Sequence, residues 1–308
     1  RFAGLFSIMG CLFAQYTTEI GVALGPSNSL TDIGGWDKPR RDFIWDLKLN
    51  STRWEIGVFG KKMLWRSDLW GAVKLAWLRI AGADSNSVYP PRYYRNLSFR
   101  TDIIELTVKV DWIYFTDYDV GRTGRYLYQL RAYWFLGTGV IYFIPRGKYN
   151  GKWYNLRLLR TEGQEKPYSP FLPFISFGPG VSFTMHKKYR FAWEFAWRIP
   201  FPFFRNADYL DDIHDRYPDP EKLPNDLARK LSNRTYERPR GTSPLGDVEY
   251  EQYGPGSPRG NPKDNDNWLS TYFSFSYVLR TRQAFYQKKY SWVVKKKKVH
   301  RIKVRYKF

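Results

Sequence analysis

Residues 189–199 alternate without interruption between two kinds of side chain. One parity is aromatic or aliphatic, and the other is small or charged: Tyr189, Phe191, Trp193, Phe195, Trp197 and Ile199 against Arg190, Ala192, Glu194, Ala196 and Arg198. Because successive side chains of a strand leave opposite faces, this alternation predicts a β-strand. A dry protein core would not accept the charged face. The two faces together fit a strand that lies between lipid and a polar lumen.

Similar alternation recurs often enough to close a barrel. The further candidate strands are residues 16–25, 53–60, 68–82, 99–115, 130–143, 173–184 and 267–280. The pattern is imperfect in two places, since 130–143 is apolar on both parities and Arg79 falls on the apolar parity of its segment. We predict an all-β fold, a closed antiparallel outer-membrane barrel of about eight strands.

The connectors between these segments sort by length. The long ones are 26–52, 83–98, 144–172 and 205–266, and the short ones are 61–67, 116–129 and 185–188. All long connectors fall on one side of the sheet, as in outer-membrane barrels with long extracellular loops and short periplasmic turns. We therefore expect both termini on the periplasmic side.

Composition agrees with a barrel. Aromatic residues make up 19% of the 308 residues, as expected for lipid-facing strands with interfacial girdles. Mean hydropathy is −0.56, and no apolar run approaches the roughly 20 residues of a membrane helix. A search for long apolar runs does not detect barrel strands, because only their alternate residues are apolar.

The two ends of the chain differ from the barrel. Residues 1–14 resemble the remnant of a signal peptide, which leaves 15–281 as the barrel with its loops. Cys11 in this segment is either a lipidation site or, as we favour, a thiol removed with the signal. The formal net charge is +21, and no acidic residue follows Asp266.

Residues 282–308 form a basic tail that we expect in the periplasm. Three interpretations remain open: a terminal signal for barrel assembly, an amphipathic strand that contacts a partner, and a solvated basic tail. We favour partner contact. Nucleic-acid binding is not expected, because the tail follows a membrane-type strand.

Several motifs, in order along residues 16–280, resemble the PorG family. They are Asp32-Ile33-Gly34-Gly35, Arg95-Asn96-Leu97-Ser98-Phe99-Arg100, Gly151-Lys152-Trp153-Tyr154, Thr161-Glu162-Gly163-Gln164, Tyr209-Leu210-Asp211-Asp212, Tyr217-Pro218-Asp219-Pro220 and Gly260-Asn261-Pro262-Lys263-Asp264-Asn265-Asp266. The resemblance implies a non-enzymatic outer-membrane component of the type IX protein secretion machinery of gliding and pathogenic bacteria. It implies association with a periplasmic ring of a PorK-like lipoprotein and a PorN-like protein. The alternative is a stand-alone small barrel that binds a ligand or surface target through its loops.

The candidate site residues fall into two groups. A barrel of about eight strands has an interior that side chains can fill, so we expect a lumen plug of Glu105, Lys109, Arg190 and Glu194 rather than a pore. Basic residues of the short turns and tail are candidates for docking an acidic partner, with lipid headgroups as the alternative: Lys61, Lys62, Arg66, Arg122, Arg125, Lys187, Lys188, Lys295, Lys296, Lys297, Lys298, Arg301, Lys303 and Arg305.

Metal and catalytic sites find little support. Asp211, Asp212 and Asp215 are weak candidates for a cation site, because their spacing matches no EF-hand loop and acidic loop residues commonly cap turns. His214 lies among these acids, but no serine or cysteine nucleophile motif accompanies it. We expect no cofactor and no enzymatic activity.

Overall fold

The computed structural model describes residues 18–33, 49–64, 66–87, 89–118, 120, 128–201, 203–204, 207–239, 241–243, 253–260 and 265–279. The predicted signal remnant with Cys11 and the basic tail 282–308 lie outside these residues. The helices in the described part of the chain are all too short or too polar to cross a bilayer.

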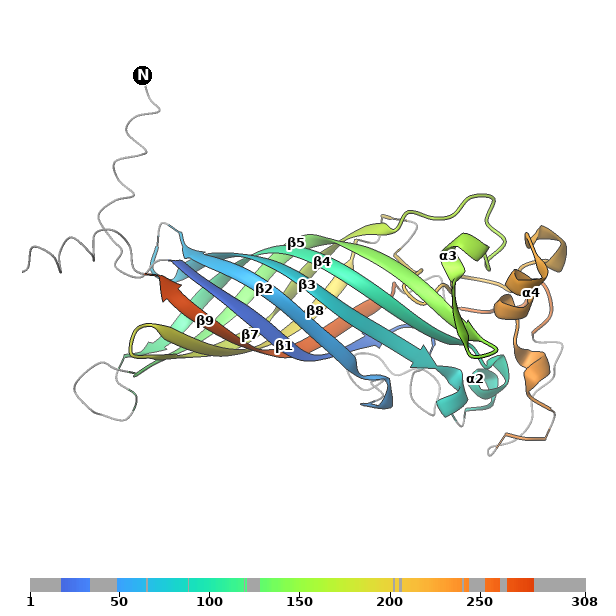
Figure 1. Cartoon of the computed structure of the whole chain (residues 1–308), viewed down its shortest axis with the longest axis horizontal. Helices are drawn as coiled ribbons and strands as arrows, with labels where there is room; N and C mark the ends of the chain where they lie inside the picture. The colour runs from blue at the N-terminus through green and yellow to red at the C-terminus, as the bar shows by residue number, and fades with distance from the viewer. Residues whose placement is uncertain are drawn as a thin grey trace, which may run out of the picture.

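The strands close into a single antiparallel barrel (Figure 1). Its eight strands are β1 (Thr18–Leu30), β2 (Arg53–Met63), β3 (Leu69–Ala83), β4 (Ser98–Asp117), β5 (Tyr128–Tyr149), β7 (Phe171–Met185), β8 (Tyr189–Pro200) and β9 (Asn267–Leu279). Pairing runs β4-β3-β2-β1-β9-β8-β7-β5, and a β4–β5 pairing completes the ring. The prediction of a closed outer-membrane-type barrel of about eight strands is confirmed.

The connectors gather by length at the two ends of the barrel. Helices α2 (Pro90–Arg95), α3 (Leu156–Leu159) and α4 (Asp226–Ser232), together with the short strand β6 (Lys152–Asn155), all belong to long connectors. In Figure 1 they lie together at one end, where they form a cap. Strand β6 pairs with the end of β5, and the two strands form a hairpin that extends beyond the ring.

The outer face of the barrel carries an apolar band. Exposed aliphatic residues such as Val22, Val108 and Leu136 cover its middle. Exposed aromatic residues lie toward both strand ends: Trp112, Tyr114, Tyr189 and Tyr277 near the short turns, and Trp77, Tyr142 and Phe171 near the cap. Aromatic girdles at the two membrane interfaces are a property of outer-membrane barrels, so this band marks the bilayer-spanning part.

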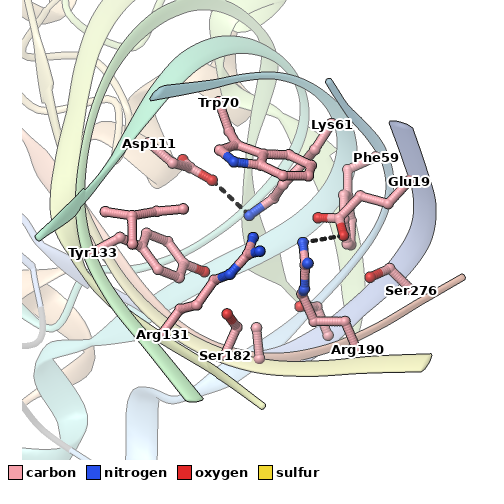
Figure 2. A pocket seen from close by; sticks show the side chains of 13 residues that line it. Glu19, Phe59, Lys61, Trp70, Asp111, Arg131, Tyr133, Ser182, Arg190 and Ser276 are labelled. Atoms are coloured by element: carbon pink, nitrogen blue, oxygen red, sulfur yellow. Dashed lines mark hydrogen bonds and ion pairs between the residues drawn. The ribbon is translucent and has the colours of Figure 1, made fainter. Parts of the chain in front are cut away.

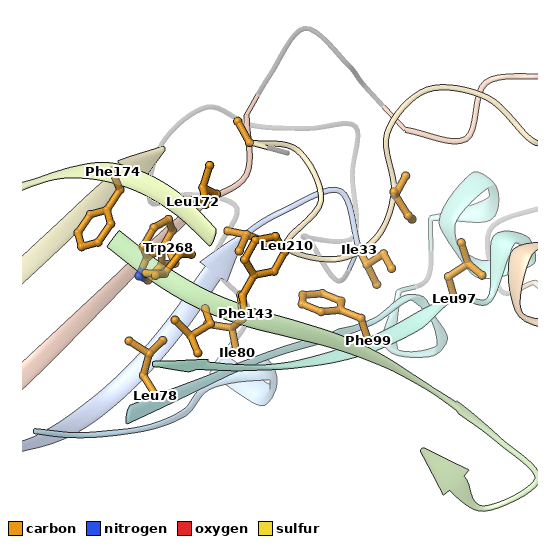
Figure 3. Packing of buried hydrophobic residues seen from close by; sticks show 14 residues of the cluster. Ile33, Leu78, Ile80, Leu97, Phe99, Phe143, Leu172, Phe174, Leu210 and Trp268 are labelled. Atoms are coloured by element: carbon orange, nitrogen blue, oxygen red, sulfur yellow. The ribbon is translucent and has the colours of Figure 1, made fainter. Parts of the chain in front are cut away.

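Inside the barrel, polarity changes along the axis. In the mid-barrel the inward side chains are charged, small or aromatic, with the rings of Phe59, Tyr133, Phe135 and Tyr272 packed among the charges. Near the cap the inward side chains are apolar and pack with the loops (Figure 3). This cluster comprises Ile33, Leu78, Ile80, Leu97, Phe99, Ile103, Ile141, Phe143, Leu172, Phe174, Ala207, Leu210, Ile213 and Trp268. The cap end is therefore organised like a water-soluble protein, with an apolar core and a polar outer surface.

The same change explains why several strands are longer than predicted. Strand β1 continues to Leu30 and β5 to Tyr149, five and six residues beyond the segments expected from the sequence. In β4, the outward residues are apolar from Ile104 to Trp112, but Arg100 and Asp102 continue the same parity toward the cap. A search for apolar outward side chains stops where the strand leaves the bilayer, although the strand itself continues.

One guanidinium ties three cap segments together. Arg95 donates from Nε and Nη2 to the two carboxylate oxygens of Asp84 at 2.7 and 2.9 Å. It also donates to the backbone carbonyl oxygens of Asp32 at 2.7 Å and Arg259 at 2.8 Å. A bidentate ion pair with two additional backbone acceptors satisfies a buried guanidinium, so the loops are held to one another and to the barrel rim.

Close strand approach inside the barrel gives a test of the packing. A Cβ added at Gly178 would lie 1.8 Å from the backbone oxygen of Phe195, whereas one added at Gly60 would meet nothing closer than 3.9 Å. We expect Gly178→Ala to destabilise the barrel by about 1–3 kcal/mol, because β7 and β8 must separate to admit the methyl group. The urea midpoint of unfolding, detected by the heat-modifiable gel mobility of the refolded barrel, measures this effect. Gly60→Ala is the matched control, and equal midpoints for the two variants would contradict the packing.

Candidate functional site

The inward parity of the mid-barrel strands builds a network of buried charges. Each participating strand places small residues beside its charged ones, as Gly57 lies between Glu55 and Phe59, so long side chains fit a narrow lumen. The buried charged side chains are Glu19, Glu55, Lys61, Lys74, Glu105, Lys109, Asp111, Arg190, Glu194 and Arg198. Since buried charges are costly unless paired, their partners decide whether the network is stable.

Glu194 of β8 is the centre of the network. Its carboxylate accepts hydrogen bonds from the ammonium groups of Lys61, at 2.8 Å, and Lys109. The hydroxyls of Tyr133 and Tyr272 donate to it at 2.7 and 2.5 Å. Four donors from four different strands therefore meet at one carboxylate, and together they saturate its acceptor capacity.

Two of these contacts extend to a second acid. Lys61 also donates to Asp111 at 2.8 Å, and Lys109 lies 3.6 Å from the same carboxylate. The Lys109 ammonium in addition lies 4.1 Å from the centroid of the Phe135 ring. Two lysines and two acids thus form a compact charge-balanced group near the middle of the barrel.

A second group lies nearer the cap. Arg198 pairs through Nε with Glu105 at 2.7 Å and through Nη2 with Glu55 at 3.2 Å, and its Nη1 donates to Ser270 at 2.7 Å. Lys74 donates to Glu55 and lies 3.5 Å from the centroid of the Tyr272 ring. Tyr272 therefore contacts both groups, because its hydroxyl binds Glu194 while its ring faces Lys74.

The short-turn end of the lumen contains a third group (Figure 2). Arg190 donates to Glu19 and to Thr184. The guanidinium carbons of Arg190 and Arg131 lie 5.1 and 5.3 Å from the ring of Trp70. The cavity that these residues line has a volume of about 20 Å³. That volume holds roughly one water molecule.

All four residues predicted for the lumen plug lie inside the barrel. Lys109 and Glu194 are direct partners, whereas Glu105 belongs to the group around Arg198 and Arg190 to the group at the short-turn end. The prediction omitted Glu55, Lys61 and the two tyrosines. Parity offered a signal for the first two, since Glu55, Gly57, Phe59 and Lys61 share one face of β2. Parity also indicates Tyr272, which shares one face of β9 with Ser270 and Ser274. It gives no signal for Tyr133, because residues 130–143 are apolar on both parities.

The proposed docking residues are only partly at the surface. Lys61 is corrected by the structure, because β2 continues to Met63 and buries its ammonium in the lumen. Lys62, Arg66 and Lys187 are exposed at the short-turn end, and Lys188 is half-buried there. The remaining candidates lie outside the described residues: Arg122, Arg125, Lys295, Lys296, Lys297, Lys298, Arg301, Lys303 and Arg305.

The three candidate metal ligands do not converge. Asp211 accepts the backbone N–H groups of Ile33 and Ile213, at 3.0 and 2.9 Å, and Asp212 accepts the hydroxyls of Thr161 and Tyr168. Asp215 is exposed beside Arg216. Among the residues that the structure describes, no group of three or more histidine, cysteine, aspartate or glutamate side chains is arranged to hold a metal ion.

The buried acids of the cap have altered proton affinities. Burial raises the pKa of Asp212 to about 6, although hydrogen bonds from Thr161 and Tyr168 oppose the rise. Burial likewise raises the pKa of Glu162 to about 7, against the effect of its ion pair with Arg259. The pKa of Asp211 also lies well above its usual range, because the group is buried close to other carboxylates.

These shifts predict that the cap is less stable at neutral pH than in mild acid. An unfolded carboxyl ionises near pH 4, whereas the folded groups stay protonated to pH 6–7. Within that interval only the unfolded state can ionise, so a rise in pH favours opening of the cap. We expect Asp212 alone to lower the free energy of cap opening by about 2–3 kcal/mol between pH 4 and 7. Hydrogen exchange of cap amides measures this change. Asp212→Asn should reduce the change by that amount, since Glu162 and Asp211 still contribute, and an unchanged profile would contradict the assignment.

The lumen network predicts a large cost for removing its central charge. Glu194→Gln leaves Lys61 and Lys109 with a single shared acid, Asp111, and we expect the free energy of unfolding to fall by about 3–5 kcal/mol. Adding Lys109→Gln removes the excess cation and should recover part of the loss. Urea midpoints of the two single variants and the double variant give the coupling. Strictly additive losses would show that the two groups do not act as a pair.

Comparisons with known proteins found matches among solved structures alone. No family model and no curated protein matches its sequence. Among solved structures it is similar to Ail of Yersinia pestis in complex with the heparin analogue sucrose octasulfate (9% identity, TM-score 0.34, covering 85% of this chain and 99% of Ail). It is also similar to Neisserial surface protein A (6%, 0.35, 86% and 98%) and to OprG of Pseudomonas aeruginosa (8%, 0.36, 87% and 99%).

Proposed function

We propose that this protein is a non-enzymatic outer-membrane component of a type IX protein secretion machinery that anchors or assembles a periplasmic ring. The observation that carries the proposal is the filled lumen. Buried ion pairs occupy the mid-barrel, and an apolar cluster lies between them and the cap. A barrel filled in this way acts through its end surfaces rather than as a conduit, and the motif resemblance to the PorG family gives the secretion context.

The proposed orientation places the short turns and both chain ends in the periplasm. Long connectors are extracellular in outer-membrane barrels. The first residue of β1, Thr18, is opposite the last residue of β9, Leu279, at the short-turn end. Residues that precede and follow the barrel would then enter the compartment in which a secretion ring assembles.

The short-turn end has the charge for an acidic partner. Lys62 and Lys187 are exposed there and Lys188 is half-buried, while the exposed Arg66 pairs with the half-buried Asp68. An exposed pair of this kind contributes little stability, so Arg66 remains available to a partner. Complementary charge at an interface favours fast and selective association. PorK-like and PorN-like ring subunits are the proposed partners.

An affinity pull-down from maltoside-solubilised outer membrane tests the proposal. The full chain should retain the ring subunits, and Lys62→Glu with Arg66→Glu and Lys188→Glu should release them, because three reversed charges repel an acidic face. Lys166→Glu with Lys222→Glu, two exposed cap positions, is the control and should retain the ring. Loss in both sets would indicate a general charge effect and contradict docking at the turns.

A version of the chain cut after Arg282 locates the docking element. Loss of the ring subunits with this cut assigns docking to the tail, and retention assigns it to the short turns. Recovery of no ring subunit with the uncut chain would overturn the secretion proposal.

A cleft in the cap favours a second function, that of a stand-alone barrel that binds a target through its loops. The cleft has a volume of about 400 Å³ and is lined by polar and charged residues from three connectors, including Asn96, Asn150, Lys148 and Arg238. Lys148, Arg234 and Arg238 outnumber the single acid Glu237, so the cleft favours an anionic target. This function takes the place of the first if no ring subunit is recovered.

A further inference from the structure

The outward face of the barrel carries a group of charged residues immediately above the apolar band on the cap side. Arg79 of β3 is directly opposite Asp102 of β4, and Arg100 of β4 is directly opposite Arg146 of β5. We call these four residues the rim cluster. Three guanidinium groups and one carboxylate leave two positive charges in excess.

The acid of the cluster is shared unequally. Arg79 Nε donates to Asp102 Oδ1 at 2.6 Å, whereas Arg146 Nη1 lies 3.8 Å from Asp102 Oδ2. The Arg146 side chain keeps 38% of its surface exposed. Asp102 therefore serves mainly Arg79, and the two arginines of the neighbouring row have little negative charge between them.

Arg100 and Arg146 form an unfavourable pair by themselves. Like charges directly opposite each other on one face of an antiparallel pair are destabilising. Arg100 is held in place by the ring of Trp153, whose centroid lies 4.2 Å from the guanidinium carbon. Its Nε is buried and has no hydrogen-bond partner among the described residues. The arrangement thus holds two positive charges close together on the outward face, with Asp102 engaged mainly by Arg79.

The depth of the cluster identifies the anion. The next outward row toward the short turns contains Trp77, Ile104 and Tyr142, all of which are exposed and apolar or aromatic. Trp54 packs edge-on against Trp77 at 4.5 Å and lies 5.4 Å from the Arg79 guanidinium. Tryptophan and tyrosine at the end of an apolar band mark the headgroup level of a membrane, so the rim cluster lies at the depth of lipid headgroups.

We propose that the rim cluster binds the phosphate of a membrane lipid headgroup on the cap side of the bilayer, with Arg100 and Arg146 as its main ligands. Arginine suits this role because its planar donors match phosphate oxygens in a bidentate manner. The neighbouring tryptophans and the apolar band would accommodate the acyl chains of the same lipid. This proposal depends only on the membrane-spanning band and is independent of a role in secretion.

Native mass spectrometry in dodecyl maltoside tests the proposal, because this detergent contains no phosphate. Diphosphoryl lipid A is the probe, and chemically dephosphorylated lipid A and inorganic phosphate are the comparison ligands. We expect the protein to bind diphosphoryl lipid A at least about tenfold more tightly than the dephosphorylated form, as charge-assisted hydrogen bonds require. Equal binding of the two lipids would overturn the proposal. Displacement of diphosphoryl lipid A by inorganic phosphate at the same concentration would also overturn it.

Variants connect the binding to the cluster. Arg100→Gln with Arg146→Gln should weaken lipid A binding about tenfold or more, and the corresponding lysine double variant should retain part of it, since charge remains but the bidentate geometry is lost. Lys166→Gln with Lys222→Gln removes the same charge from the exposed cap and should bind as the unaltered protein does. Heat-modifiable mobility establishes that every variant is folded. Undiminished binding by the folded glutamine double variant would overturn the assignment.

Discussion

The need to pair charge inside a narrow barrel underlies the rest of this structure. Eight strands enclose a space that side chains fill, and most of the charges within it are almost completely removed from water. Each of these charges destabilises the fold unless a partner offsets its desolvation. The four donors at Glu194 come from β2, β4, β5 and β9, so one carboxylate on β8 depends on the correct register of four other strands.

This pairing also explains the division of the interior along its axis. Charges occupy the part of the lumen surrounded by the apolar outer band, where the strands face lipid. Beyond the band, water can reach the outer surface, and the interior changes to an apolar core that includes loop residues such as Ile33 and Leu210. At every level, therefore, one face of the barrel wall is polar and the other is apolar. The apolar face is the outer one within the bilayer, and it is the inner one beyond the membrane boundary on the cap side.

The filled interior leaves three surfaces on which a function can depend. The short-turn end is basic, the cap contains a polar cleft, and the outer face carries arginines at headgroup depth. Arg79 connects these arginines to the sequence pattern, since it is a charged residue on the apolar parity of its segment. In the structure that exception marks the position where β3 leaves the bilayer, with Trp54 and Asp102 as its neighbours.

The sequence by itself determined the strands, the closed barrel and the sorting of loops, because alternation is local: each side chain faces lipid or lumen according to its parity alone. The same reasoning placed Glu105, Lys109, Arg190 and Glu194 in the lumen. Only the tertiary structure decided which charges pair, that β2 continues far enough to carry Lys61 into the lumen, and that Asp211 and Asp212 face different partners. These outcomes depend on register around the ring and on contacts between residues up to 178 positions apart, as for Ile33 and Asp211, which a period of two residues does not encode.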